Sequence, residues 1–436
     1  MTDRAMLAIG WSMADGSDDP ARRDQPPTAQ RPGTFAPFGF AAFRNVWAAN
    51  TLSQIGAQIQ LVGAGWLMTE LTSEHRMVAG VQAANAMAML FLSVPAGALA
   101  DNFDRRRIML LANWFMLLVS AVLAVQAWRG QLTPWSLLGF SLLVGAGMTM
   151  QLPAWQASVR ALVDGRVLPQ AISLNSVAFN LARTVGPALG GMILAVAGVS
   201  AAFAVNALSY VALIAVFARW RPRVLPLTRQ PLLPSIWAGL IGYAASPPLR
   251  RLLLRGMAYT CGAMAVQALL PVVVRNLHGG ETDFGVLLGA FGVGSVAGAI
   301  FAPTLRRRAG AEWTIAAATA TVSLGLAGLS VASSVLTALP CVLVGGMAWA
   351  LSMTTMNVST QLRAPEDMLG RIMSINQATV LGAAAIAAWG WGTLADFAGL
   401  RTALGMAAGY MALSGLFLHF LAPMPARGEG VVLGRA

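Results

Sequence analysis

Lysine is absent from this chain of 436 residues, and charge of either sign is scarce. All 29 basic side chains are arginines, 17 side chains are acidic, and charged residues make up only 11% of the sequence. A soluble domain typically contains about 25% charged residues, whereas 57% of this chain is hydrophobic and its mean hydropathy is +0.65. The depletion of charge extends along the whole chain and indicates that lipid surrounds most of the protein.

Cysteine and histidine are nearly as rare, which excludes several classes of site. Cys261 and Cys341 lie in apolar segments and the three histidines do not cluster, so we expect neither a disulfide framework nor a metal centre. We find no phosphate-binding loop and no nucleophile–base pair, and therefore expect no enzyme, no cofactor and no ATP-driven transport. The net charge of +12 does not indicate nucleic-acid binding, because the arginines fall in short clusters between apolar segments.

Long apolar segments are what the chain has in abundance. A helix needs roughly 20 apolar residues to cross the hydrocarbon core of a bilayer. Twelve segments satisfy this length: 46–69, 77–100, 107–128, 134–157, 169–195, 198–219, 252–275, 282–304, 311–331, 334–358, 368–394 and 400–422. We therefore predict an all-α integral membrane protein with twelve transmembrane helices.

The polar stretches between these segments divide the chain into five parts. Residues 1–40 are rich in Asp, Arg, Pro and Gly without periodicity and predict a disordered tail. Six spans fall in 41–220 and six in 248–422, with a linker at 221–247 and a second tail at 423–436. Within the linker, Leu232 to Ala245 is interpreted either as a short helix at the membrane surface or as plain linker.

Arginine is distributed unevenly between the two sides of the predicted bundle. If the N-terminus is cytoplasmic, 24 arginines lie in cytoplasmic segments, four lie in outside loops, and Arg183 lies within a span. Because basic residues are retained on the cytoplasmic side during insertion, this asymmetry predicts an inner (plasma) membrane protein with both termini in the cytoplasm.

The two predicted halves share a weak internal repeat at an offset of 201 residues. The stretch 97–107 matches 298–308, and three later positions match in the same register: Ser158 with Ser359, Ser173 with Ser374, and Asn175 with Asn376. Several regions in one register indicate two related six-helix halves. The second copy has Ala302 where the first has Asp101.

Two motifs connect these halves to a known family. The loop GALADNFDRRRIML follows the pattern G-x-L-a-D-r-x-G-r-r that the major facilitator superfamily carries between its second and third helices. The matching residues are Gly97, Leu99, Asp101, Arg105 and Arg106, and the departures are Asn102 and Asp104. The fifth predicted helix is similar to the antiporter signature g-x-x-x-G-P-x-x-G-G, at Ala182, Gly186, Pro187, Gly190 and Gly191.

From Phe43 to Leu421 the chain thus resembles the major facilitator superfamily, and within it the branch of the enterobactin exporter and related secretion-type carriers. The resemblance implies twelve helices in two pseudo-symmetric six-helix halves. It also implies that Asp101 lies near the start of the eleventh helix, where a carboxylate gains about 0.3–1 kcal/mol from the helix dipole. Such a contact would latch the cytoplasmic side shut, with Gly97 in the loop and Arg105 and Arg106 either orienting Asp101 or serving topology alone.

Arg183 lies deep within a predicted span, about 21 Å along its helix at 1.5 Å per residue. An arginine near mid-membrane is costly and normally faces a cavity or a partner, yet no Asp or Glu lies at comparable depth in any predicted span. Two interpretations stay open. Arg183 binds an anionic group of a substrate, or carbonyls and amides of neighbouring helices satisfy it, with Asn180 and Pro187 on the same helical face.

Amide side chains mark the other candidate substrate contacts. Asn50, Gln54 and Gln58 follow one another at helical spacing in the first span. In the superfamily the first, fourth, seventh and tenth helices line the central cavity, so the resemblance implies that this stripe, Gln267 and Asn357 contact the substrate. Hydrogen bonding between helices is the alternative for the stripe. The remaining lining is apolar, Met-rich and aromatic, which suits a bulky amphiphilic compound.

We therefore predict a secondary transporter that exports a bulky amphiphilic small molecule, such as a drug, siderophore or secondary metabolite, by alternating access. Its partners are the substrate, the bilayer and, by the resemblance, protons, and we expect a monomer.

Glu70 and Asp396 are the candidates for the residue that couples transport to protons. The glycines of the antiporter-like motif are expected to pack helices closely. The alternatives are an importer or facilitator of a small metabolite and a non-transporting membrane sensor.

Overall fold

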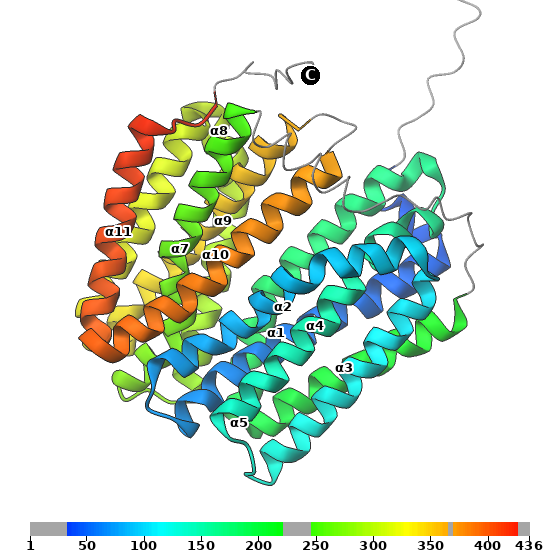
Figure 1. The fold of residues 1–436 in the computed structure, drawn as a ribbon, viewed down its shortest axis with the longest axis horizontal. Helices are drawn as coiled ribbons and strands as arrows, with labels where there is room; N and C mark the ends of the chain where they lie inside the picture. The colour runs from blue at the N-terminus through cyan, green and yellow to red at the C-terminus, as the bar shows by residue number, and fades with distance from the viewer. Residues whose placement is uncertain (1–32, 221–245, 365–368, 426–436) are drawn as a thin grey trace, which may run out of the picture.

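The computed structural model describes residues 33–220, 246–364 and 369–425, which form two helical bundles (Figure 1). The first bundle contains α1 (Ala41–Leu71), α2 (His75–Asn102), α3 (Arg105–Trp128), α4 (Pro134–Ser158) and α5 (Leu168–Arg219). The second contains α7 (Pro247–Asn276), α8 (Glu281–Val331), α9 (Val335–Gln361), α10 (Leu369–Ala398) and α11 (Leu400–Leu421). Short 3-10 turns occupy Ala36–Gly39, Val159–Ala161 and Gly165–Val167. The predicted surface helix 232–245 and most of the predicted tails lie outside the described residues.

Two of these helices are too long to be single membrane spans. α5 has 52 residues and α8 has 51, which at 1.5 Å per residue is more than twice the ~30 Å hydrocarbon core. Each breaks at a glycine in the left-handed region, Gly198 with φ 75° and Gly310 with φ 82°, a conformation that glycine adopts without a Cβ clash. The chain reverses direction at these breaks (Figure 1). The break at Gly198 separates the predicted spans 169–195 and 198–219, and the break at Gly310 separates 282–304 from 311–331.

Eight of the described helices are long and apolar enough to cross a membrane: α3, α4, α5, α7, α8, α9, α10 and α11. Their outward faces carry large apolar side chains that water would not solvate well. Trp114 and Leu118 on α3 and Leu413 and Phe420 on α11 are all more than half exposed. A continuous apolar surface of this kind marks contact with lipid, and the described structure is accordingly that of an all-helical membrane protein.

A buried polar network ties three segments of the first bundle together. Gln60 on α1 accepts a hydrogen bond from the Ser120 hydroxyl on α3 at 2.8 Å and from the Asn206 amide on α5 at 2.6 Å. Asn206 also donates to the Tyr210 hydroxyl. Because all four side chains are buried, this network fixes the register of α1 against its neighbours.

The second bundle has its own polar staple at the end where α7 begins. Glu312 on α8 accepts two hydrogen bonds from the Arg255 guanidinium on α7, at 2.7 and 2.9 Å. The same carboxylate contacts His419 Nδ1 on α11 at 2.6 Å and accepts from the Met424 backbone N–H. Arg255 is only 4% exposed, so Glu312 neutralises a buried charge while it joins three elements.

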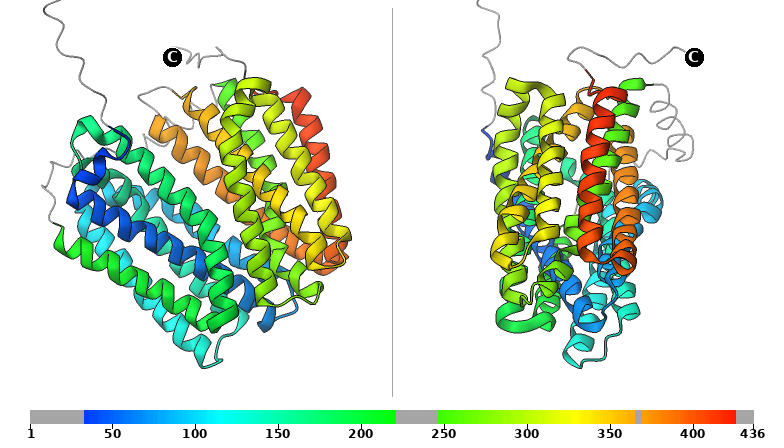
Figure 2. Two further views of the ribbon diagram at one scale, coloured as in Figure 1. Left: turned by 180° about the vertical axis from the view of Figure 1, so that it is seen from behind. Right: turned by 90° about the vertical axis from the view of Figure 1, so that its left-hand side faces the viewer.

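The axes of the two bundles are inclined to each other. In Figure 1 the ribbons approach one another at the end opposite the C-terminus and diverge toward the end where the C-terminus lies, and the view from behind in Figure 2 shows the same arrangement. We call the end where the bundles approach one another the locked end; it contains the connections 72–74 and 277–280 and Gly399. We call the opposite end, where α1 and α7 begin, the terminal end.

Candidate functional site: the contact zone between the bundles

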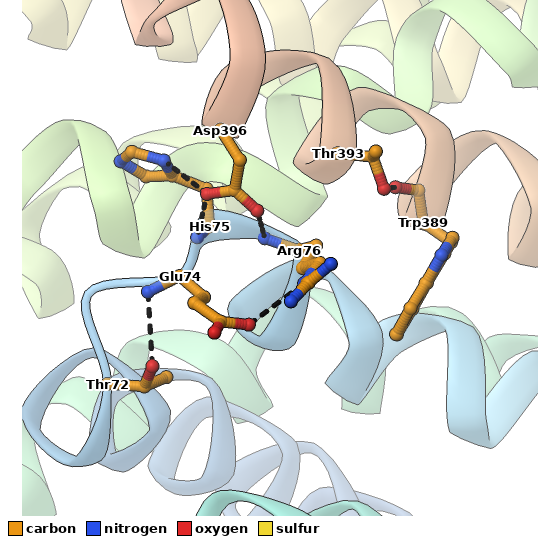
Figure 3. A network of polar contacts seen from close by, with 7 residues as sticks. All are labelled: Thr72, Glu74, His75, Arg76, Trp389, Thr393 and Asp396. Atoms are coloured by element: carbon orange, nitrogen blue, oxygen red, sulfur yellow. Dashed lines mark hydrogen bonds and ion pairs between the residues drawn. The ribbon is translucent and has the colours of Figure 1, made fainter.

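At the locked end, Asp396 of α10 reaches across to the first turn of α2 (Figure 3). One carboxylate oxygen accepts a hydrogen bond from the His75 backbone N–H at 2.6 Å and contacts His75 Nδ1 at 2.9 Å. The other oxygen accepts from the Arg76 backbone N–H at 3.0 Å. A side chain of the second bundle therefore caps a helix of the first.

The capping follows from what α2 lacks. The first N–H groups of a helix have no partner within the helix, and Glu74, which precedes α2, makes no side-chain cap. The Glu74 carboxylate instead accepts from Arg76 Nε at 2.8 Å, and this hydrogen bond together with the charge of Glu74 raises the pKa of Arg76 above its ordinary value. The negative charge of Asp396 lies where the helix dipole favours it.

A glycine allows α10 to come this close to α2. A Cβ at Gly392 would lie 2.7 Å from both the Arg76 Cα and the Ala79 Cβ. A second close approach pairs Gly80 of α2 with the Trp389 ring, at 3.0 Å from the corresponding Cβ position. Two small residues thus set the distance between the helices that Asp396 joins.

The contact continues between α1, α5 and α8. Gly191 of α5 lies so close to Gly285 of α8 that a Cβ on either would collide with the backbone of the other. Beside it, the Trp66 ring of α1 stacks on the Phe284 ring of α8 with centroids 5.5 Å apart, and both rings are buried. Arg275 donates to the Thr69 hydroxyl at 3.5 Å. The locked end is therefore closed by backbone contact, aromatic packing and hydrogen bonds together.

The glycines of the antiporter-like motif face two different partners. A Cβ at Gly186 would lie 2.5 Å from the Gln58 Cβ, and one at Gly190 would lie 3.1 Å from the Val62 Cβ, so both glycines pack α5 onto α1 within the first bundle. Only Gly191 faces the second bundle. Pro187 lies between them, half-buried inside α5.

The residues of the predicted latch lie at the terminal end, where the bundles diverge. The side chains of Asp101 and Asn102 lie outside the described part of the structure. Arg106, which we expected to orient Asp101, donates to the carbonyl oxygens of Phe217 and Ala218 at the end of α5, both at 2.8 Å. A Cβ at Gly97 would meet nothing within 4 Å. Whether Asp101 latches this end stays a prediction.

Sequence reasoning assigned no role to Asp104, which departs from the family pattern. The structure shows that Asp104 is the N-cap of α3, where its side chain accepts from the Arg106 backbone N–H at 2.9 Å. Arg105 also contacts the end of α2, through a hydrogen bond to the Ala100 carbonyl at 3.4 Å. The sequence signal that could have found this role is simple N-cap preference, since Asp104 directly precedes the helix that begins at Arg105 and Asp is a preferred N-cap residue.

The predicted substrate contacts are distributed over several helices. Gln54 on α1 and Gln267 on α7 each keep a buried amide atom without a hydrogen-bond partner among the described residues, the oxygen in Gln54 and the nitrogen in Gln267. Asn50 is buried, Gln58 is half-buried against α5, and Asn357 is exposed. The Asn180 side chain lies outside the described part.

Arg183 is exposed, and two aromatic rings flank it. Its guanidinium carbon lies 5.7 Å from the centroid of the Phe179 ring on α5 and 5.7 Å from that of the Trp349 ring on α9. No described residue gives this guanidinium a hydrogen bond or an ion pair. Neither Phe179 nor Trp349 was identified from the sequence as part of the site, because nothing local marks one aromatic residue among many as facing a distant arginine.

The model of one protein family, described as transmembrane secretion effector, matches residues 32–430. The chain is 25% identical to the staphyloferrin A transporter of Staphylococcus aureus over 61% of this chain and 67% of that protein. It is 25% identical to the enterobactin exporter EntS of Citrobacter koseri over 76% of this chain and 80% of that protein.

Two solved transporters of similar fold are in inward-facing states. A bacterial homologue of the human lysosomal transporter Spinster, inward-facing and unoccupied, aligns with a TM-score of 0.67 at 13% identity, covering 88% of this chain and 95% of that one. A bacterial homologue of the iron transporter ferroportin aligns with a TM-score of 0.65 at 16% identity, covering 87% and 98%. At these identities the likeness shows the fold.

Proposed function

Because this chain belongs to the transmembrane secretion effector family of the major facilitator superfamily, we propose that it exports a siderophore-like small molecule by alternating access. It is a multi-pass membrane transporter and not an enzyme. The two curated relatives above carry a siderophore in their names, staphyloferrin A and enterobactin. Their similarity to this chain supports a substrate of that general kind.

The proposed topology has twelve spans and two cytoplasmic termini. Eight helices qualify directly, α1 and α2 have 31 and 28 residues, and the breaks at Gly198 and Gly310 divide α5 and α8 into two spans each. The arginine asymmetry of 24 to four supports a plasma-membrane orientation in which the terminal end faces the cytoplasm. In that orientation the locked end faces outward, and the structure corresponds to an inward-facing state.

One observation supports alternating access: the contacts between the two bundles that the described residues make lie toward one end. The Asp396 cap on α2 and the Gly191–Gly285 contact close the outer side, while the ribbons diverge toward the terminal end (Figure 1). A carrier needs a second closure that forms when the first one breaks. We propose that the loop with Gly97, Asp101, Arg105 and Arg106 supplies it.

The proposed substrate path runs between the bundles. The amide groups of Gln54, Gln58 and Gln267 would offer hydrogen bonds there, together with Asn50, Asn180 and Asn357. The unpaired amide atoms of Gln54 and Gln267 support this role, because a buried polar atom without a partner is costly unless water or a ligand satisfies it. Gly186 and Gly190, with Pro187 between them, pack α5 onto α1, Gly191 closes the path against α8 on the outer side, and the carrier acts as a monomer.

Transport in everted membrane vesicles tests this function. We expect inward accumulation of a siderophore, with enterobactin and staphyloferrin A as the two probes, when a pH gradient is imposed. A protonophore that collapses this gradient should abolish accumulation, and accumulation that persists would refute proton antiport. Uptake into right-side-out vesicles in place of everted ones would identify an importer, and no movement of either probe or of mixed amphiphilic compounds would favour a sensor.

A further inference from the structure

Arg183 lies between two aromatic rings that the sequence did not identify. Phe179 lies one turn before Arg183 on α5, whereas Trp349 comes from α9 of the other bundle, and both ring centroids lie 5.7 Å from the guanidinium carbon. The Trp349 ring in turn contacts the ring of buried Tyr259 on α7, with centroids 6.4 Å apart. Two packed aromatic rings of the second bundle, Trp349 and Tyr259, thus lie beside the guanidinium of the first bundle, with Trp349 next to it.

This environment satisfies only part of what a guanidinium needs. Rings within about 6 Å attract the cation through their faces, but its five N–H donors remain, and they point along the plane of the group. Among the described residues no carboxylate, carbonyl or hydroxyl accepts from them. The fork geometry of these donors matches a carboxylate, which accepts two parallel hydrogen bonds.

We infer that Arg183, Phe179 and Trp349 form a binding site for a planar aromatic anion, in which Arg183 holds the anionic group and the two rings stack on the aromatic part. Phe179 is 48% exposed and Arg183 is exposed as well, so a ligand reaches both without displacing the core. The site rests on the proposed function only in that its ligand would be the exported cargo, since the binding itself needs no transport.

The position of the site connects binding to the state of the carrier. Arg183 lies eight residues before Gly191, about 12 Å along α5 from the contact that closes the locked end. It therefore lies on the side of that closure that faces the terminal end, in the middle part of the helix, and transporters built from two repeats generally bind substrates near the midplane. A ligand held by Arg183 and Phe179 on one bundle and by Trp349 on the other contacts both moving parts.

Two small probes of matched shape test the site in the purified full-length protein. Salicylate and its neutral counterpart salicylamide share a planar hydroxylated ring and differ in one negative charge. Binding is measured by isothermal titration calorimetry in detergent. We expect salicylate to bind the unaltered protein and to bind Arg183→Gln at least about tenfold more weakly, as the loss of charge-assisted hydrogen bonds predicts. Salicylamide should bind both proteins alike.

Three further variants separate binding from a structural role. Arg401→Gln removes an equal charge from the exposed start of α11 and should leave salicylate binding unchanged. Trp349→Leu should weaken salicylate and salicylamide to the same degree, because stacking does not depend on the anion. Arg183→Lys should restore part of the salicylate affinity, and it serves as the readout if Arg183→Gln does not fold.

Several results would overturn the inference. They are a lack of salicylate binding to the unaltered protein, equal losses of salicylate and salicylamide in Arg183→Gln, or unchanged salicylate affinity in that variant. Equal losses of salicylate and salicylamide affinity would assign Arg183 a structural role between the bundles. Failure of the vesicle assay combined with selective salicylate binding would refute the export function while leaving the site intact.

Discussion

The Asp396 cap offers the sharpest perturbation of the locked end. Asp396→Asn keeps the size of the side chain but leaves one acceptor oxygen where the carboxylate uses two, one for His75 N–H and one for Arg76 N–H. The variant loses one hydrogen bond to a charged group, roughly 1.5–3 kcal/mol, and the favourable charge at the start of α2, about 0.3–1 kcal/mol. Because the carboxylate is partly exposed, we take a total near the lower bound, about 2 kcal/mol.

A loss of about 2 kcal/mol shifts the equilibrium between the two closures roughly 30-fold toward opening of the locked end. After Cys261 and Cys341 are replaced by serine, spin labels are attached at Ser73 and Arg401, two exposed positions at the locked end on different bundles. Pulsed electron–electron double resonance then measures the distance between the two labels and reports the shift. We expect the population at a longer distance to grow in Asp396→Asn relative to the labelled parent.

A control residue lies on the same helix, one turn away. Thr393 donates its hydroxyl to the Trp389 carbonyl within α10 (Figure 3), so Thr393→Val removes a hydroxyl without touching α2. We expect the distance distribution of this variant to match that of the labelled parent. The reasoning is refuted if Asp396→Asn gives the parent distribution too, because the cap would then contribute nothing to the lock.

Three more changes have defined outcomes. Glu312→Gln leaves buried Arg255 without its counter-charge and should lower the free energy of unfolding in detergent by about 3 kcal/mol, and an unchanged denaturant midpoint would contradict the staple. Gly392→Leu should prevent closure of the locked end and abolish vesicle transport while the protein still inserts, and near-normal transport would show that α10 and α2 can separate without cost. Asp101→Asn should leave expression intact and cripple transport, and parental rates would remove the latch hypothesis.

The sequence predicted the helices well because their determinants are local. Runs of about 20 apolar residues have few structures available to them in a bilayer, and the predicted spans agree with the helices at most boundaries. The breaks at Gly198 and Gly310 were placed within a few residues, since glycine and a short polar stretch mark a reversal. α3 begins at Arg105, two residues before the predicted span 107–128.

The candidate site was predictable only where a family motif marked it. The glycines around Pro187 were expected to pack helices, and Gly186 and Gly190 do so against α1. Only the tertiary structure showed that, among these glycines, Gly191 contacts the second bundle. The sequence presented Asp396 only as an acid at a span end and a candidate coupling residue. Its role as a cap on α2 joins residues 320 and 321 positions apart, a separation over which no local pattern carries information.

The sequence alone determined the solvent of this protein, the lengths of its helices, its division into two halves and the family to which it belongs. Each of these depends on composition and spacing, because a chain in lipid must satisfy its backbone within helices whatever those helices contact. The tertiary structure alone decided which end of the two halves is joined and which side chains meet there. Helices that are equally apolar on several faces can pack in many ways, and the choice among them depends on a few close contacts, such as Gly191 with Gly285, that exist only once both bundles are folded.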